Sequence, residues 1–149
     1  MNASIPKIPA PPALEKCAVG DRLPTLERRI ELATLVRYAG ASGDFNAIHF
    51  DEAFARAAGL EGVIGHGMLA MGLMSEAVTD WAVDSGAVGE LSVRFAGQYR
   101  PGDVLTIDGE VTGRTTDEDG GVVLHVSLTC TNQDGTEVLR DAKATLRPR

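Results

Sequence analysis

The chain has 149 residues, an ordinary globular composition and a formal net charge of −7. This length suits one domain with a buried core, and the negative charge argues against general nucleic-acid binding, which requires a basic surface. Two cysteines, Cys17 and Cys130, are too few for a disulfide framework. The longest apolar stretch, residues 68–83, is interrupted by polar and acidic side chains, so we do not expect a membrane span.

The N-terminal residues are rich in proline and alanine and lack the apolar region of a signal peptide. We expect residues 1–16 to form a flexible arm and residues 17–149 to form the single domain. A cytoplasmic location is the simplest expectation for such a chain. Residues 25–30 alternate weakly between polar and apolar side chains, which predicts a short edge strand.

Two helices are predicted after this strand. The first begins at Leu32, where apolar residues follow the helical spacing i, i+3, i+4 and i+7, and we expect it to end at Gly40. The second covers residues 52–58. Asp51 is a suitable N-cap for it, and Gly59 is a suitable residue just beyond its C-terminus.

The longest predicted helix covers about residues 68–84 and is apolar over most of its circumference, so other structure must wrap it. Four later runs alternate between polar and apolar residues and are joined by tight turns, which is typical of an antiparallel meander. The sequence therefore predicts an α+β fold in which a curved antiparallel sheet surrounds a central helix. The four runs are residues 91–99, 105–111, 122–130 and 136–146.

Side chains suited to proton transfer gather in residues 38–51. Asp44, Asn46 and His49 fall within six residues of one another. A histidine titrates near neutrality, and a nearby carboxylate can orient it or share a water molecule with it. Gly43 permits a sharp turn that aims polar side chains at one point. We therefore interpret Asp44 and His49 as a candidate acid/base pair.

A second glycine-rich segment, residues 62–68, leads into the longest helix. Its backbone N–H groups lie at the start of that helix, which is where a developing negative charge is best received. An acid/base pair together with a site for an oxyanion is more than a plain globular domain requires.

Several segments match one known family when they are taken together with the predicted layout. The chain resembles the MaoC-like hydratases and dehydratases, which are (R)-specific enoyl-CoA hydratases and (3R)-hydroxyacyl-carrier-protein dehydratases. The likeness is especially close to the short dehydratase subunits of actinobacterial fatty-acid elongation. One departure is Ala47, where the family usually has proline. The matching segments are Ser42–His49, Gly65–Met68, Ser92–Phe95 and Arg100–Asp103.

The resemblance implies a hotdog fold, usually paired as a dimer. It also implies roles for individual residues. Asp44 and His49 would be the catalytic pair, and the backbone N–H of Gly67 would hold the oxygen of a thioester. Asn46 would help to hold the loop or the water. Ser75 occupies a helix position that lies beside the substrate pocket in some members.

The implied reaction is reversible syn addition of water to a trans-2-enoyl thioester, which gives a (3R)-3-hydroxyacyl thioester. The substrate would be carried by coenzyme A or by an acyl carrier protein. No metal and no redox cofactor is needed for this chemistry. We expect a homodimer, and we expect neither nucleic acid nor a membrane as a partner.

Other interpretations remain open or are disfavoured by the residues. A thioesterase of the same fold class would use a carboxylate of the long helix, Glu76 or Asp80. A non-catalytic acyl-binding subunit of a heterodimer is a further alternative. We interpret His66 as structural, with its ring bonded to the backbone near the helix start. A metal site built from His49, His66 and His125 has no supporting spacing.

Overall fold

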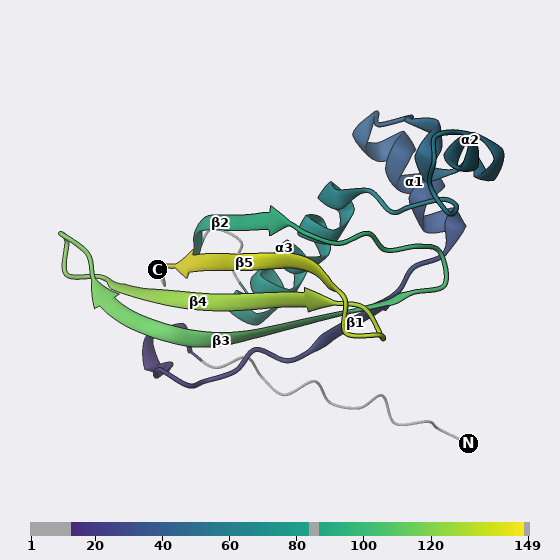
Figure 1. Cartoon of the computed structure of the whole chain (residues 1–149). Coiled ribbons are helices and arrows are strands. Elements are labelled where there is room, and N and C mark those ends of the chain that lie inside the picture. The colour runs from purple at the N-terminus through teal and green to yellow at the C-terminus, as the bar shows by residue number, and fades with distance from the viewer. Residues whose placement is uncertain (1–12, 84–86, 148–149) are drawn as a thin grey trace, which may run out of the picture.

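The structure is a computed structural model that describes residues 13–83 and 87–147. Within these residues, five strands form one sheet, and the longest helix, α3, lies along it (Figure 1). The helices α1 and α2 stand together beyond one end of the sheet. In chain order the strands and α-helices are β1 (Leu26–Arg29), α1 (Leu32–Ser42), α2 (Glu52–Ala57), α3 (Gly67–Ala82), β2 (Val88–Phe95), β3 (Val104–Thr116), β4 (Val122–Thr131) and β5 (Glu137–Leu146), and a short 3₁₀ helix (Ala47–His49) lies between α1 and α2.

The strand order across the sheet is β1-β3-β4-β5-β2. The strands β3, β4 and β5 form the predicted antiparallel meander, and β1 is the predicted edge strand. The prediction that the preceding strand also belongs to this meander was wrong, because β2 pairs with β5 at the opposite edge.

The segment 96–103 explains this difference, because it is a long connection rather than a tight turn. The predicted strand over residues 91–99 begins earlier, at Val88, and ends at Phe95. Tyr99 was expected on the strand, but it lies in the connection and is only 1% exposed. Its carbonyl accepts a hydrogen bond from the N–H of Gly65 at 2.7 Å, which draws the connection to the segment before α3.

The first helix continues past its predicted end at Gly40. It ends at Ser42, and Gly43 follows in the left-handed conformation with φ of 76°. A glycine inside a helix costs about 1 kcal/mol relative to alanine but does not stop it, whereas the left-handed residue does. This ending places Asp44 directly after the helix terminus.

The other two predicted helices are confirmed. Asp51 caps α2 by accepting a hydrogen bond from the N–H of Phe54 at 2.9 Å, and Gly59 is left-handed with φ of 87°. The helix α3 ends at Ala82, two residues before its predicted end at residue 84, and Val83 follows in the left-handed conformation with φ of 59°. Among the described helices, none is both long enough and apolar enough to cross a membrane.

The hydrophobic core lies between α3 and the sheet, as the sequence predicts for a helix that is apolar on most sides. Leu14, in a short 3₁₀ helix (Leu14–Lys16), also belongs to this core and is 7% exposed. Residues 1–12 of the predicted arm lie outside the described residues, and the domain boundary at residue 17 stays a prediction. Core residues include Met74, Val78 and Trp81 of α3, and Leu105, Ile107, Leu124, Val126 and Leu146 of the sheet.

Candidate active site

The loop that follows α1 is shaped by hydrogen bonds from backbone N–H groups to nearby side chains. The N–H of Asp44 donates to Oγ of Ser42 at 3.2 Å. The N–H of Asn46 donates to Oδ1 of Asp44 at 3.2 Å, and the N–H of Ile48 donates to Oδ1 of Asn46 at 3.3 Å. Such bonds are how Asx turns fix a backbone. They hold this loop although Ala47 lacks the fixed φ of a proline.

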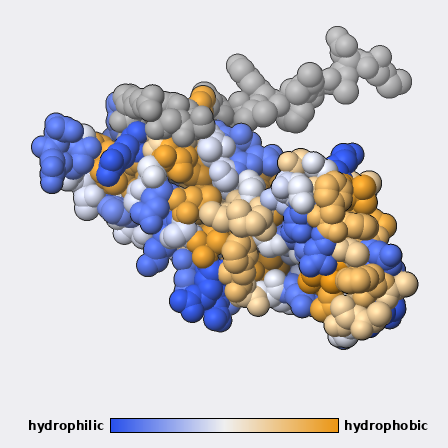
Figure 2. All heavy atoms as spheres, turned by 90° about the horizontal axis from the view of Figure 1, so that it is seen from above, coloured by the Kyte–Doolittle hydropathy of each residue, from blue (hydrophilic) through white to orange (hydrophobic). Residues whose placement is uncertain are grey.

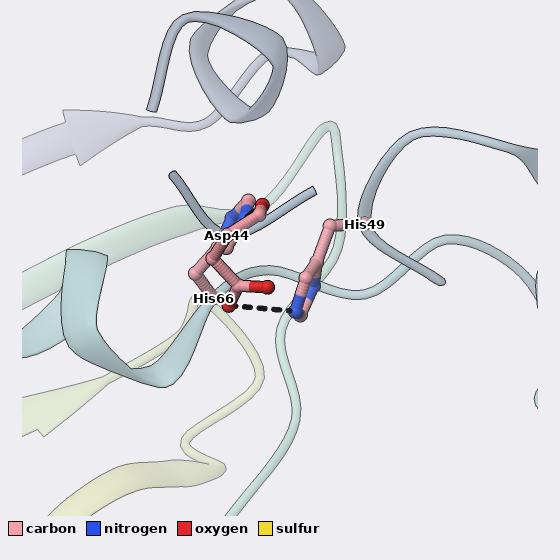
Figure 3. A group of neighbouring side chains, drawn as sticks. All are labelled: Asp44, His49 and His66. Carbon is pink, nitrogen blue, oxygen red and sulfur yellow. Dashed lines mark hydrogen bonds and ion pairs between the residues drawn. The ribbon is translucent and has the colours of Figure 1, made fainter. Parts of the chain in front are cut away.

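Asp44 and His49 point toward each other across a short gap (Figure 3). Oδ2 of Asp44 lies 3.8 Å from Nε2 of His49. The Asp44 side chain is 52% exposed, and that of His49 is 10% exposed. The separation is too long for a direct hydrogen bond, so the two atoms can share a bridging water molecule.

The other ring nitrogen of His49 determines its tautomer. Nδ1 lies 2.8 Å from the carbonyl oxygen of Ile64. A carbonyl can only accept, so Nδ1 carries the hydrogen, and the neutral ring keeps its lone pair on Nε2. The basic nitrogen of His49 therefore faces the carboxylate of Asp44.

His66 packs directly against this pair. Its ring is stacked on that of His49, with centroids 3.8 Å apart and planes at 25°, and the ring of Tyr38 meets it edge-on at 4.9 Å. Nε2 of His66 lies 3.2 Å from the carbonyl oxygen of Asp44. The ring is bonded to the backbone, as predicted, but the acceptor lies in the loop after α1 and not near the start of α3. Burial lowers the pKa of His66, and the bond to the Asp44 carbonyl opposes this effect only in part.

Gly67 is the first residue of α3, so its N–H has no acceptor within the helix. Gly67 and the following Met68 are exposed at the helix start. The residue before them is fixed by Tyr99, whose hydroxyl donates to the carbonyl of His66 at 2.6 Å. A Cβ on Gly65 would lie 2.0 Å from the Tyr99 ring, so a side chain there has no room. These contacts fix the direction in which the first N–H groups of α3 point.

Asn46 and Ser75, the remaining predicted site residues, differ in their distance from this cluster. Asn46 acts on the loop backbone through its hydrogen bond to Ile48. Ser75 is half-buried two helical turns beyond Gly67, about 12 Å along the axis, so it does not belong to the cluster of Asp44 and His49. A role for Ser75 beside the substrate stays a prediction.

The structure brings three possible metal ligands together, but they are not the three histidines considered from the sequence. Asp44, His49 and His66 each offer one donor atom, and these atoms lie within 4.8 Å of one another. Lone pairs of imidazole lie in the ring plane, and two stacked rings at 25° do not direct them at a common point. His125 is elsewhere, on β4, with Nε2 2.9 Å from Oγ1 of Thr115. The arrangement fits a shared water better than a shared cation.

The two carboxylates of α3 that a thioesterase would use, Glu76 and Asp80, lie apart from the loop that carries Asp44. Glu76 forms an ion pair with Arg28 of β1. Asp80 lies one turn further along α3 and is exposed. Neither belongs to the cluster of Asp44 and His49.

Exposed apolar side chains lie next to residues of the candidate site. Figure 2 shows apolar atoms over the middle of the view and again at its right, the end of the molecule that carries α1 and α2. Phe45 and Met68, each next to a candidate site residue, are 65% and 56% exposed, and Phe95 is 53% exposed. Exposed apolar surface beside polar groups is typical of a ligand-binding or protein-binding face.

Comparisons with known proteins agree on one family. A family model described as a MaoC-like domain matches residues 16–132. The fatty acid synthase beta subunit aflB of Emericella nidulans is 37% identical over 116 residues, which is 75% of this chain and 5% of that protein. The (R)-specific enoyl-CoA hydratase of Aeromonas caviae is 34% identical over 95 residues, 62% of this chain and 70% of that protein.

Solved structures give the same result. The (R)-hydratase from A. caviae matches with a TM-score of 0.78 at 27% identity, over 91% of this chain and 99% of that chain. A structure of the ChsH1–ChsH2 complex from Mycobacterium tuberculosis matches with a TM-score of 0.76 at 29% identity, over 89% and 98% of the two chains.

The chain belongs to the MaoC-like family, because the family model covers most of its length. The resemblance drawn from the sequence and the expected α+β hotdog fold are both confirmed. The chain spans about a twentieth of the fatty acid synthase subunit that it matches, so the other activities of that large protein are not carried over.

Proposed function

We propose that the protein catalyses the reversible hydration of trans-2-enoyl thioesters to (3R)-3-hydroxyacyl thioesters in fatty-acid metabolism. The observation that carries this proposal is the pair of acceptors itself: Oδ2 of Asp44 and Nε2 of His49 lie 3.8 Å apart, so one water molecule beside them can donate a hydrogen bond to each. Relatives named as (R)-specific hydratases support the reaction type.

Water is a poor nucleophile at neutral pH, so a base must take its proton as the oxygen attacks C3. A water held by Asp44 and His49 donates one hydrogen bond to the carboxylate and one to the imidazole lone pair. The pair takes one proton from this water as its oxygen bonds to C3. The same proton then passes to C2 on the same face of the substrate, which gives syn addition. In the reverse direction the pair removes the C2 proton and returns it to the departing hydroxyl group.

The negative charge that develops on the thioester oxygen needs a donor nearby. The N–H of Gly67 has no acceptor in its own helix and points out of the positive end of α3. One donor of this kind lowers the barrier by roughly 3–4 kcal/mol. The helix dipole acts on the same charge. Asp44 and His49 would thus act at C2 and C3 of the substrate while Gly67 acts at its carbonyl.

The acyl crevice is proposed to be completed by a second copy of the chain. Two surface hollows lie on the sheet, each with Glu90 and His125 in its lining, and neither includes Asp44 or His49. Around the pair, exposed apolar side chains such as Phe45 and Met68 are open on one side. A homodimer would cover them and leave a sheltered channel for the acyl chain.

The substrate carrier is proposed to be coenzyme A. A protein with a net charge of −7 is a poor partner for an acidic carrier protein. The decisive measurement is loss of enoyl-thioester absorbance with crotonyl-CoA and with a long-chain enoyl-CoA, with the stereochemistry of the product determined. Formation of the (3R) alcohol is expected. Release of free coenzyme A without hydration would instead identify a thioesterase and overturn the proposal.

A further inference from the structure

His66 is held by more contacts than an N-cap residue requires. Its side chain is buried, at 2% exposure, and Nε2 lies 3.2 Å from the carbonyl oxygen of Asp44. Its ring is stacked on His49 and is met edge-on by Tyr38. Its own carbonyl accepts the hydroxyl hydrogen of Tyr99. One side chain therefore contacts the backbone of one member of the candidate pair and the ring of the other.

The hydrogen bond to Asp44 assigns the tautomer of His66. The carbonyl can only accept, so Nε2 carries the hydrogen and Nδ1 keeps the lone pair. Nδ1 is buried and has no hydrogen-bond partner within the described residues. An unpaired buried nitrogen weakens the folded state, so stability alone does not account for a histidine at this position.

We propose that His66 is the positioning residue that holds Asp44 and His49 at the separation required for one shared water. This inference rests on the proposed hydration reaction. His66 does not touch the reacting atoms, because its ring is covered by His49 and Tyr38. It acts through its donor on the Asp44 carbonyl and through its stacking on the His49 ring.

The other anchors of the loop explain why such a residue is needed. The hydrogen bonds among Ser42, Asp44 and Asn46 are exposed, and water competes with them. Exposed hydrogen bonds of a loop open at low cost in free energy. The bond from His66 is made by a buried side chain at a helix start, so it ties the loop to the rigid end of α3. Misplacing a reacting group by 1 Å can lower the rate by about 10²-fold.

Electrostatics around His66 agree with this role. The titratable groups that face it are His49 and Asp44 from the loop, Tyr38 from α1 and Tyr99 from the connection before β3. Burial lowers the pKa of His66 and keeps its ring neutral. A neutral ring can stack on His49 while that residue carries the transferred proton, whereas two stacked cations would repel each other.

Two substitutions separate the proposed contacts. His66→Phe keeps an aromatic ring against His49 but removes the donor to Asp44. His66→Gln keeps an N–H group near the position of Nε2 but removes the ring. We expect kcat to fall about 10²-fold in His66→Phe and about tenfold in His66→Gln, with KM for crotonyl-CoA changed by less than about twofold. His125→Gln, on the sheet, is the control and is expected to keep its kcat.

A double variant distinguishes positioning from a general loss of packing. In the His49→Ala background the pair is already broken, so adding His66→Phe is expected to change the residual kcat by less than about twofold. A further loss as large as that of the single variant would overturn the proposal. So would unchanged kcat in both single variants while near-ultraviolet circular dichroism shows a native fold.

A magnetic-resonance measurement tests the geometry without any activity. In protein labelled with ¹⁵N-histidine, we expect His66 to show the neutral tautomer with hydrogen on Nε2, and the ring protons of His49 to lose their ring-current shift in His66→Gln. The opposite tautomer, or no change at His49, would overturn the positioning role. If these signals are as expected but no enoyl thioester is hydrated, the proposed function fails and the positioning of His49 by His66 stands.

Discussion

The carboxylate of Asp44 faces the imidazole of His49 with one oxygen only. Oδ2 lies 3.8 Å from Nε2, whereas Oδ1 accepts the backbone hydrogen bond of Asn46. One side chain thus shapes its own loop and presents an acceptor to a water molecule. A substitution by asparagine separates these two roles, because its side-chain amide keeps one oxygen to accept from Asn46 but has no second carboxylate oxygen to face His49.

Asp44→Asn removes the charged oxygen that faces His49 and leaves an oxygen to accept from Asn46. We expect kcat for crotonyl-CoA hydration to fall by about 10²–10⁴-fold, because a positioned acid/base group contributes that much. Thermal unfolding should occur near the wild-type temperature, since the turn is retained. Turnover within tenfold of the wild type would show that this carboxylate does not take part in the reaction.

His49→Asn provides the matching test on the other side of the gap. The amide nitrogen of asparagine can replace Nδ1 as the donor to the Ile64 carbonyl, but nothing replaces the lone pair of Nε2. We expect a fall in kcat of at least about 10²-fold while the circular dichroism spectrum stays native. Comparison with His49→Ala, which loses both nitrogens, measures how much of the effect comes from the anchoring bond. Equal activity of His49→Asn and the wild type would show that the imidazole of His49 does not take part in the reaction.

The pair could be found from the sequence because it is local. Asp44 and His49 are five residues apart in a loop made by short-range hydrogen bonds, and such bonds depend only on neighbouring residue types. The same holds for the caps of α2. The end of α1 was misplaced at Gly40 because a glycine inside a helix and a glycine beyond its end look alike in a sequence, and only the left-handed φ of Gly43 distinguishes them.

The contacts that complete the site could not be found in this way. His66 meets the carbonyl of Asp44 across 22 residues, and Tyr99 meets His66 across 33. The second contact depends on the connection between β2 and β3, which carries Tyr99 and whose course follows from the pairing of β2 with β5. The alternation of polar and apolar residues is equally consistent with Tyr99 on the face of a strand and with Tyr99 in the connection after β2. The only hint in the sequence is a tyrosine directly before the Arg100–Asp103 turn. Its contact with His66 can be inferred only when the order of the strands is known.

Removal of metal ions tests whether Asp44 and His49 hold a water molecule, as proposed, or a metal ion. The stacked rings of His49 and His66 do not converge on a single ion, although their donor atoms are close. We therefore expect kcat to be unchanged after dialysis against EDTA, measured with crotonyl-CoA before and after dialysis. Loss of activity on dialysis with recovery on addition of zinc would assign this cluster to a cation instead.

Tyr99→Phe tests the buried bond that fixes the residue before Gly67. Burial raises the pKa of Tyr99, so its hydroxyl remains a donor at every pH used for assay. Without it the His66 carbonyl loses a 2.6 Å hydrogen bond but still accepts from the N–H groups of Leu69 and Ala70. We therefore expect the free energy of unfolding to fall by about 0.5–1.5 kcal/mol. Tyr38→Phe is the matched control, because that half-buried ring has no hydroxyl hydrogen bond within the described residues. Similar urea midpoints for both variants would contradict the prediction.

Gly65→Ala and Gly67→Ala form a final matched pair, two residues apart. A methyl group on Gly65 would lie 2.0 Å from the ring of Tyr99, which is 1% exposed and cannot move aside. A methyl group on Gly67 would lie 3.0 Å from the ring of Phe95, which is 53% exposed and free to turn.

We therefore expect Gly65→Ala to lose about 1–3 kcal/mol of stability through overpacking. Gly67→Ala is expected to be neutral or slightly stabilising, because alanine favours helix over glycine. Chemical denaturation of the two proteins side by side measures the difference. If Gly65→Ala unfolds at the same urea concentration as Gly67→Ala, the connection carrying Tyr99 does not press against the segment before α3, and the anchoring of the proposed oxyanion donor by Tyr99 is wrong.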